Sequence, residues 1–333
     1  MKKYKLALIG ATGIVGRETL KILHERNFPT AELHLLASSN SVGTLLDFGG
    51  KHLVVEPLNS FDFSGIDLAI FCVPSEIAAK YVWKATAKGA IAIDNSTYYR
   101  TDPDVPVIIP EVNADAIKLV KRKGIIANSN CAAIQMLLAV KPLHDFAKAK
   151  RIVVSTYQSV SGWGKFAMDE LYDQSVALFK RQEVKIQHLY RRIAFNVIPQ
   201  IDKFMDDGAS VEEWKIRHDT GKILDKKIKV SATCVRVPVL KGHSEAINIE
   251  FARPISPEKA REILAKAPGV QVTDDYLTPA EAENKDAVFV SRIRKDDTVK
   301  NGLSLWVVSD NIRKGAALNT VQIAEELAKR KLI

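Results

Sequence analysis

Three glycines near the N-terminus constrain the fold of this 333-residue chain more than any other feature. An apolar run at residues 5–9 leads into the segment Gly10-Ala11-Thr12-Gly13-Ile14-Val15-Gly16, and a helical pattern of apolar residues follows it. Glycines at such spacing let the backbone turn tightly between a strand and a helix and approach a pyrophosphate closely. The N–H groups at the start of the helix attract its negative charge. The spacing is G-x-x-G-x-x-G rather than G-x-G-x-x-G, so a tight turn without a ligand is the alternative interpretation.

The pattern of apolar segments changes near Cys131. Before it, short apolar runs (33–37, 67–73, 89–94, 107–109, 124–127) alternate with helical patterns, among them residues 75–88 with Ser75 as the predicted N-cap. This alternation is typical of βαβ units with a parallel sheet. After it, a predicted helix (132–148) precedes long segments rich in β-branched residues (151–158, 229–239, 246–251, 288–293, 303–308), and residues 313–331 are helical. These segments predict an antiparallel or mixed sheet with helices on one face.

The fold class that follows is α/β, with a Rossmann-like parallel-sheet domain and a second, α+β domain built on a large mixed sheet. We expect residues 1–130 plus 314–333 to form the first domain and residues 131–313 to form the second.

The charge balance admits several kinds of partner, since 48 Lys and Arg residues against 39 Asp and Glu residues give a net charge of +9. The excess is dispersed, without aromatic interleaving or a zinc-finger pattern, so we expect no nucleic-acid partner. No apolar run approaches the ~20 residues of a membrane helix, and no secretory signal precedes the first strand. We therefore expect no membrane association and a cytoplasmic location. The cysteines have neither disulfide-framework nor zinc spacing, so no metal is predicted.

A candidate nucleophile and a candidate base stand out. Cys131 follows Asn130 at the start of a predicted helix, where amide donors and the helix dipole stabilise a thiolate and an oxyanion. Cys72 and Cys234 lie in apolar strand patterns typical of buried, inert cysteines. His243 lies between two predicted strands, as a proton acceptor or as an ordinary hairpin histidine.

Together these motifs identify a family. Along essentially its whole length the chain resembles the aspartate-β-semialdehyde dehydrogenases, in segments 10–16, 94–100, 102–113, 130–136, 155–162, 195–201, 212–215, 234–239, 242–245, 306–311 and 314–317. The resemblance implies reversible, NADP-dependent reductive dephosphorylation of aspartyl phosphate to aspartate semialdehyde, in lysine, threonine and methionine biosynthesis. It also implies a homodimer, with a homotetramer as the alternative.

The resemblance further implies the roles of individual residues. Cys131 would be the nucleophile, His243 the acid and base, and Gln158 and Asn130 would support the acyl intermediate. Arg236 would pair with the substrate carboxylate, Glu212 with its ammonium, and Arg100 and Lys215 would hold phosphate. The cofactor would contact the residues of the glycine loop and of three later segments: Gly10, Thr12, Gly13, Ile14, Val15, Gly16, Ser38, Ser39, Ser41, Ser161, Gly162, Asn311 and Asn319.

The sequence pattern supports two of these assignments, the Glu212–Lys215 pair and the NADP cofactor. Glu212 and Lys215 are three apart in a helical pattern and share a face, although a surface ion pair would have the same spacing. The second predicted strand ends in serines and Asn40, without the carboxylate that selects NAD, which favours NADP. NAD is the alternative, because the family commonly has Arg where Asn40 stands.

Other departures from the family are Ser129, Ala132-Ala133, the bulky Trp163 near the expected nicotinamide, the run 218–222, and a short segment between residues 172 and 195. They motivate a non-catalytic NADP-binding paralogue as one alternative function. The other is a related reductase, acting on N-acetylglutamyl phosphate or an acyl-CoA. An N-acylated substrate has no ammonium for Glu212, so the Glu212–Arg236 pair distinguishes it from a free amino acid, whereas dependence on phosphate distinguishes phosphate from CoA chemistry.

Overall fold

A mainly parallel sheet forms the centre of the first of two units in the computed structural model, which describes residues 2–333. This unit, unit 1, comprises Met1–Ser129 and Ala316–Ile333. The strand order of its sheet is β3-β4-β2-β1-β5-β6-β8-β7. Among the described strands of this sheet, only the β3–β4 pair is antiparallel. The strands are β1 (Tyr4–Ile9), β2 (Thr30–Ala37), β3 (Leu45–Phe48), β4 (Lys51–Pro57), β5 (Leu68–Phe71), β6 (Ile91–Asp94), β7 (Val107–Ile108) and β8 (Ile125–Asn128).

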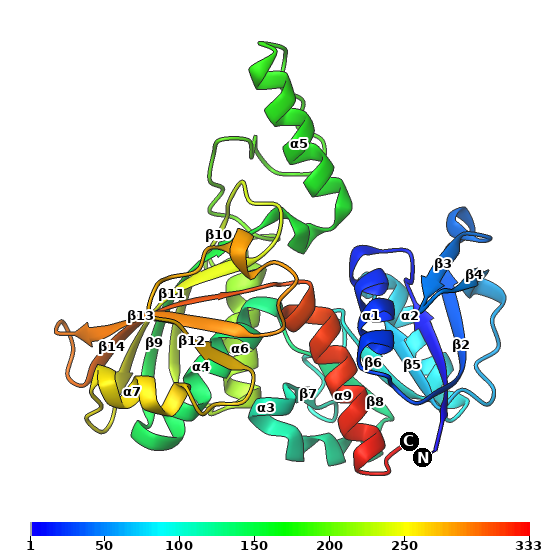
Figure 1. Ribbon diagram of the computed structural model, residues 1–333, viewed down its shortest axis with the longest axis horizontal. Helices are drawn as coiled ribbons and strands as arrows, with labels where there is room; N and C mark the ends of the chain where they lie inside the picture. The colour runs from blue at the N-terminus through cyan, green and yellow to red at the C-terminus, as the bar shows by residue number, and fades with distance from the viewer. Residues whose placement is uncertain (1) are drawn as a thin grey trace. The chain divides into compact units, whose positions relative to one another are not determined.

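Helices cover this sheet and complete its core (Figure 1). They are α1 (Ile14–Glu25), α2 (Ser75–Ala87), the short α3 (Pro110–Asn113) and the C-terminal α9 (Leu318–Lys329). α9 returns to pack against α1, and apolar residues of both helices, such as Leu23 and Leu327, are buried with those of β1. The ion pair of Arg26 with Glu325, at 2.7 Å, joins the two helices at the surface.

Unit 2, Asn130–Gly315, is built on a six-stranded mixed sheet of order β10-β9-β11-β14-β13-β12. β10 runs parallel to β9, whereas β11 is antiparallel to both β9 and β14. The strands are β9 (Ala149–Gln158), β10 (Lys229–Arg236), β11 (His243–Phe251), β12 (Val270–Val272), β13 (Val288–Asp296) and β14 (Gly302–Ser309). The α/β class and the mixed second sheet expected from the sequence are therefore confirmed.

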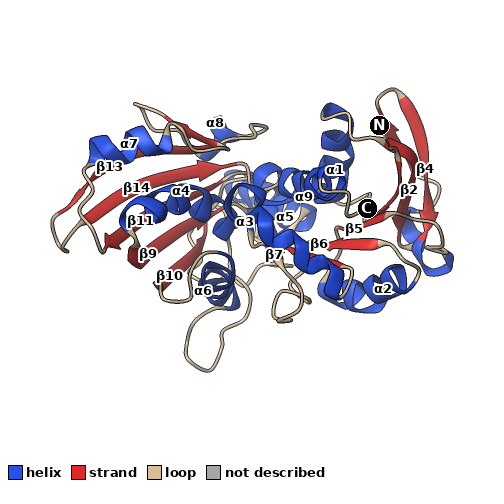
Figure 2. Cartoon of the chain, turned by 90° about the horizontal axis from the view of Figure 1, so that it is seen from below, coloured by secondary structure: helices blue, strands red, loops and turns tan. Residues whose placement is uncertain are grey.

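One layer of helices packs on the six-stranded sheet: α4 (Cys131–Ala147) at its centre, flanked by α6 (Val211–Ile223) and α7 (Pro257–Leu264) (Figure 2). The short α8 (Pro279–Ala282) packs on β14. α5 (Lys165–Phe179) extends away from this sheet and has a small core of its own with residues such as Leu189 and Ile193 (Figure 1).

One detail expected from the sequence is wrong, and one alternative is excluded. Ser75 is the first residue of α2, and Pro74 takes the N-cap position, because proline has the extended backbone of a cap and no N–H to leave unbonded. His243 does not lie in a hairpin: β10 and β11 both pair with β9 and not with each other, so the connection between them crosses a strand.

No described helix has the length and apolar character needed to cross a bilayer.

Candidate active site

The start of α4 presents Cys131 as its first helical residue. Asn130 is the N-cap, and its side-chain oxygen accepts a hydrogen bond from the Ala133 N–H at 3.1 Å. A side chain in the first helical turn lies among N–H groups without intrahelical partners and at the positive end of the helix dipole, where a thiolate is stabilised. The backbone of Ala133 makes this bond, so the alanines at 132 and 133 keep the cap intact.

The two other cysteines lack such a setting. None of the described cysteines forms a disulfide. Burial raises the pKa of Cys72 to about 12, and burial together with the nearby Glu212 raises the pKa of Cys234 even further. Both are therefore protonated and unreactive at neutral pH, which singles out Cys131 as the nucleophile candidate.

Gly315 lies directly against the nucleophile candidate. A Cβ atom on Gly315 would come within 2.9 Å of Cys131 Cβ and 3.4 Å of its Cα. The residue therefore fits here only as glycine, with its backbone packed directly against the first residue of α4.

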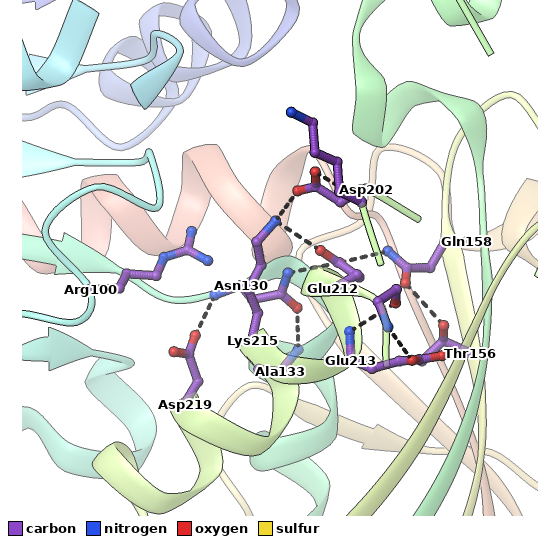
Figure 3. Close-up of polar contacts among 12 residues, drawn as sticks. Arg100, Asn130, Ala133, Thr156, Gln158, Asp202, Glu212, Glu213, Lys215 and Asp219 are labelled. Carbon is purple, nitrogen blue, oxygen red and sulfur yellow. Dashed lines mark hydrogen bonds and ion pairs between the residues drawn. The ribbon is translucent and has the colours of Figure 1, made fainter. Parts of the chain in front are cut away.

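Glu212 on α6 is the centre of a buried polar network (Figure 3). Its Oε1 accepts hydrogen bonds from Asn130 Nδ2 at 2.8 Å and Gln158 Nε2 at 3.1 Å, and its Oε2 lies 3.2 Å from Lys215 Nζ. Burial alone would raise the pKa of Glu212, but the Lys215 charge and the two amide donors outweigh it and lower the pKa to about 2. Glu212 is therefore a permanent anion.

Lys215 also reaches Asp202 Oδ2, at 3.1 Å. The Lys215 and Glu212 side chains are only 12% and 6% exposed, which excludes the surface ion pair that their spacing alone allowed.

Gln158 and Arg236 end two adjacent strands and are paired in register. Arg236 is 4% exposed, and its Nη1 donates to the Ser159 carbonyl oxygen at 2.7 Å. Its Nε–H is buried and has no hydrogen-bond partner among the described residues. Burial lowers the pKa of Arg236, and the charges of Glu212 and Cys131 oppose that shift, so the guanidinium remains the positive partner of both.

His243 begins β11 opposite Gln158, and its ring is held from one side. Nδ1 accepts a hydrogen bond from the Ser159 backbone N–H at 3.1 Å, so this nitrogen carries no proton. The neutral ring therefore bears its proton on Nε2, which is buried and has no partner in the described part of the chain. Burial, then the Arg236 charge, lower the pKa of His243 to about 3, which keeps the ring neutral.

Gly162 lies close to both of these side chains. A Cβ there would lie 3.0 Å from Arg236 Nη1 and 3.5 Å from His243 Nε2. A buried donor without a partner costs free energy that a ligand oxygen recovers. Buried donors of this kind are therefore suited to an anionic, oxygen-bearing substrate.

We expect Gly162→Ala to lower kcat/KM by about 10- to 100-fold, because the added methyl group displaces the guanidinium or the substrate. Steady-state kinetics on the purified variant measure this. Gly221→Ala in α6 is the matched control: its added Cβ would lie 3.8 Å from the Lys226 Cα, an ordinary van der Waals contact, and activity should be retained. Equal activity of Gly162→Ala and the wild type would contradict a role for Arg236 and His243 in binding the substrate.

Ser161 and Asn311, expected at the cofactor, bond to each other in unit 2. Asn311 Oδ1 accepts from the Gly242 N–H at 2.8 Å and from Ser161 Oγ at 3.1 Å, and both residues are 3% exposed. They tie the 159–162 segment to the residue before His243. Trp163 lies 38% exposed with its ring 5.2 Å from that of Tyr190.

The glycine loop of unit 1 has the strand–loop–helix context that the sequence predicts. Gly10 has a φ of +81°, and a Cβ on it would lie 2.2 Å from the Cys72 carbonyl oxygen; one on Gly16 would lie 2.1 Å from the Gly10 oxygen. Gly13 caps α1 without a side-chain hydrogen bond, so no side chain covers the N–H groups of Ile14 and Val15. Such a loop fits a dinucleotide pyrophosphate.

The neighbouring loop supplies hydroxyl groups. Ser38, Ser39 and Asn40 are exposed after β2, and Ser41 Oγ lies 3.3 Å from Thr12 Oγ1 of the glycine loop. These donors lie beside the loop, as binding of the ribose end of a dinucleotide requires.

Arg100 and Asn319 are both buried in unit 1. Arg100 Nε donates to the Asn128 carbonyl oxygen at 2.9 Å, so it is not a solvated turn residue. Asn319 Nδ2 donates to Asn128 Oδ1 at 2.6 Å and to the Ile108 oxygen at 3.0 Å. Asn319 is thus committed to holding the α9 start against β7 and β8. No cluster of metal-ligating side chains occurs within residues 2–333.

Sequence reasoning missed Glu245, two residues after His243 and on the same face of β11. It is fully buried, and neither carboxyl oxygen has a hydrogen-bond partner among the described residues. Burial raises the pKa of Glu245 well above its usual value, and the neighbouring Gln135 opposes this only in part. The side chain is therefore protonated in the folded protein. Its polar character among strand residues was visible in the sequence, but its burial was not.

We expect Glu245→Gln to stabilise the fold at about pH 8 by about 1–3 kcal/mol, and less at about pH 5. Above its ordinary pKa, Glu245 is ionised when unfolded but protonated when folded, so its contribution to stability falls as pH rises. Glutamine has the same shape and does not titrate. Denaturant unfolding at the two pH values measures the difference, and a gain independent of pH would contradict a protonated Glu245.

Known proteins with similar sequences and structures cover the whole chain. Residues 5–120 match the family model of the semialdehyde dehydrogenase NAD-binding domain, and residues 140–314 that of the semialdehyde dehydrogenase dimerisation domain. An aspartate-semialdehyde dehydrogenase of Aquifex aeolicus is 52% identical, and one of Rickettsia typhi 47% identical, each over 99% of both chains.

The solved structure of aspartate semialdehyde dehydrogenase II from Vibrio cholerae, complexed with ASA, has a TM-score of 0.98 at 44% identity, over 99% of both chains. The Candida albicans aspartate semialdehyde dehydrogenase with NADP has a TM-score of 0.78 at 25% identity, over 100% of both chains.

Proposed function

The chain belongs to the aspartate-semialdehyde dehydrogenase family, and from this we propose how its residues carry out the reaction. It is an oxidoreductase of amino-acid biosynthesis that converts aspartyl phosphate to aspartate semialdehyde and phosphate, reversibly. The observation that carries the residue assignment is the pair of buried, unsatisfied donors, Arg236 Nε and His243 Nε2, whose side chains both lie close to Gly162 in the unit that carries Cys131.

Cys131 is the nucleophile in this proposal. In the reductive direction its thiolate bonds to the carbonyl carbon of the acyl phosphate, the C–O bond to phosphate breaks, and an aspartyl thioester remains on the sulfur. A covalent intermediate divides one difficult step into two easier ones. When bound, the reduced nicotinamide supplies the hydride that converts the thioester to the aldehyde level.

His243 serves the oxygen of that carbonyl group. Its Nε2–H donates to the oxyanion of each tetrahedral intermediate, together with the N–H groups at the α4 start. At the thiohemiacetal the neutral ring keeps its proton and stabilises the oxyanion through this hydrogen bond; the oxygen electron pair then re-forms the C=O bond as the C–S bond breaks and the thiolate leaves.

The other side chains bind the substrate ends. Arg236 offers its Nε–H to the substrate α-carboxylate, which a guanidinium binds in its plane. The permanent anion Glu212 receives the ammonium group, and its two amide donors, Asn130 and Gln158, keep its carboxylate in place. A free amino-acid substrate uses both charges, whereas an N-acylated one would leave Glu212 without a partner. By resemblance, Arg100 and Lys215 hold the phosphate.

The two domains are assigned different roles. We assign cofactor binding to residues 1–130 plus 314–333, and catalysis and dimerisation to residues 131–313. The assignment of a nicotinamide cofactor is supported by the glycine loop and by the match of residues 5–120 to the NAD-binding domain model. We propose NADP rather than NAD, since the serines after β2 offer donors to a 2′-phosphate and no carboxylate repels it.

A homodimer is the assembly we propose, in the cytoplasm. Phe166 and Phe179 on α5 are 69% and 79% exposed, and large aromatic side chains of this kind are enriched at protein interfaces. They lie within the segment that matches the dimerisation-domain model.

Oxidation of aspartate semialdehyde, followed at the nicotinamide absorbance, tests the substrate and cofactor. We expect reduction of NADP⁺ that depends on phosphate and is much faster than reduction of NAD⁺. Activity with coenzyme A in place of phosphate would indicate the acyl-CoA reductase instead, and a preference for NAD⁺ would overturn the cofactor assignment alone. No reaction with either cofactor would contradict the function.

A further inference from the structure

A second carboxyl group of α6 also contacts the start of α4. Asp219 follows Glu212 by seven residues, which is two helical turns, so both lie on one face of α6. It is fully buried, and its Oδ2 accepts a hydrogen bond from the Asn130 backbone N–H at 2.9 Å (Figure 3). Asp219 has no role in the reaction proposed above.

Asn130 is therefore held at both ends by one helix. Glu212 binds its side-chain amide, and Asp219 binds its main chain. The remaining side-chain oxygen of Asn130 accepts the Ala133 N–H, and its carbonyl accepts the Ile134 N–H at 2.8 Å. Since Cys131 is the next residue, these contacts fix the backbone from which its sulfur projects.

Asp219 is itself fixed in position. His218 Nδ1 lies 3.1 Å from Asp219 Oδ1, and the His218 ring stacks on that of Trp214 with centroids 4.8 Å apart. This arrangement uses two residues of the run 218–222, which the resemblance marked as unusual.

We propose that Asp219 is a positioning residue for the nucleophile: by binding the Asn130 N–H it sets the direction of Cys131 Sγ toward the substrate carbonyl. The inference rests on the proposed role of Cys131. In this proposal Asp219 acts through a hydrogen bond and not through its charge. An uncharged oxygen acceptor of the same shape should therefore perform the same role. Small displacements of a reacting atom are costly, since about 1 Å is enough to lose about 100-fold in rate.

Three variants test this. We expect Asp219→Ala to lower kcat by about 10- to 100-fold with a KM for aspartate semialdehyde within about twofold of the wild type. Asp219→Asn retains an oxygen that accepts the Asn130 N–H and should recover most of the lost kcat. Arg217→Ala is the control on the same helix, since the ion pair of its guanidinium, at 3.3 Å, is with the exposed Asp207, and activity should not change.

Hydrogen exchange of the Asn130 amide gives a readout that does not depend on activity. Exchange should accelerate in Asp219→Ala and stay slow in Asp219→Asn, while both variants keep the wild-type far-ultraviolet circular dichroism. An Asp219→Asn variant as impaired as Asp219→Ala would show that the charge matters rather than the bond to Asn130, and would overturn the proposal. Wild-type kcat in Asp219→Ala would overturn it too. Failure of the proposed function would appear instead as a fully active Cys131→Ala variant.

Discussion

Cys131→Ala should lower kcat by at least about 10⁴-fold, because no other described thiol is placed to form the acyl intermediate. The glycine loop belongs to unit 1 and Cys131 to unit 2, so binding of NADPH should keep its wild-type affinity. Stopped-time assays with concentrated enzyme measure the residual rate, and fluorescence titration measures the binding of NADPH.

The matched control is Cys234→Ala, which removes a buried thiol from β10. It should keep kcat and lose some stability through the small cavity left behind. Retention of more than a few per cent of activity in Cys131→Ala would rule out the nucleophile assignment. Loss of activity in both variants, with both folded, would point to a role for the sheet thiol that the structure does not indicate.

Replacements of His243 should differ according to which ring nitrogen they replace. Glutamine places an amide group near the position of Nε2 and keeps a donor for the oxyanion. Asparagine reaches only the position of Nδ1, where Ser159 N–H donates. We expect His243→Asn to lower kcat by about 10²- to 10⁴-fold and His243→Gln to lose about tenfold less. The reverse order would contradict the proton on Nε2.

The pH dependence of the wild type checks the same ring. The pKa of His243 is lowered to about 3, since burial and the Arg236 charge outweigh the attraction of Glu212. A group with a depressed pKa that is neutral in its basic form stays neutral as pH rises, so kcat/KM should show no ionisation of His243 between about pH 5 and 8. A step near pH 6 to 7 that vanishes in His243→Gln would contradict a neutral ring.

Local sequence patterns predict the parts of the site that depend on neighbours along the chain. The glycine loop lies between β1 and α1, Cys131 begins α4, and Glu212 and Lys215 share a face of α6. Strand–loop–helix order and helical periodicity fix all three, since each involves residues at most a few positions apart.

The order of strands was not predictable from such patterns. Gln158 is the register partner of both Arg236 and His243, because β9 lies between β10 and β11. The sequence places these three residues at the ends of strands, but only the sheet topology brings the ends together. The Asp219 bond to Asn130 spans 89 positions and depends equally on how α6 packs against α4.

Covalent capture of the acyl intermediate tests directly whether Cys131 is the nucleophile. Enzyme mixed with aspartyl phosphate in the absence of reduced cofactor is quenched in acid, digested, and analysed by mass spectrometry. We expect one aspartyl thioester per chain on the peptide that contains Cys131, with release of an equal amount of phosphate, and no adduct in Cys131→Ala. An adduct on another residue, or an active enzyme that yields none, would contradict it.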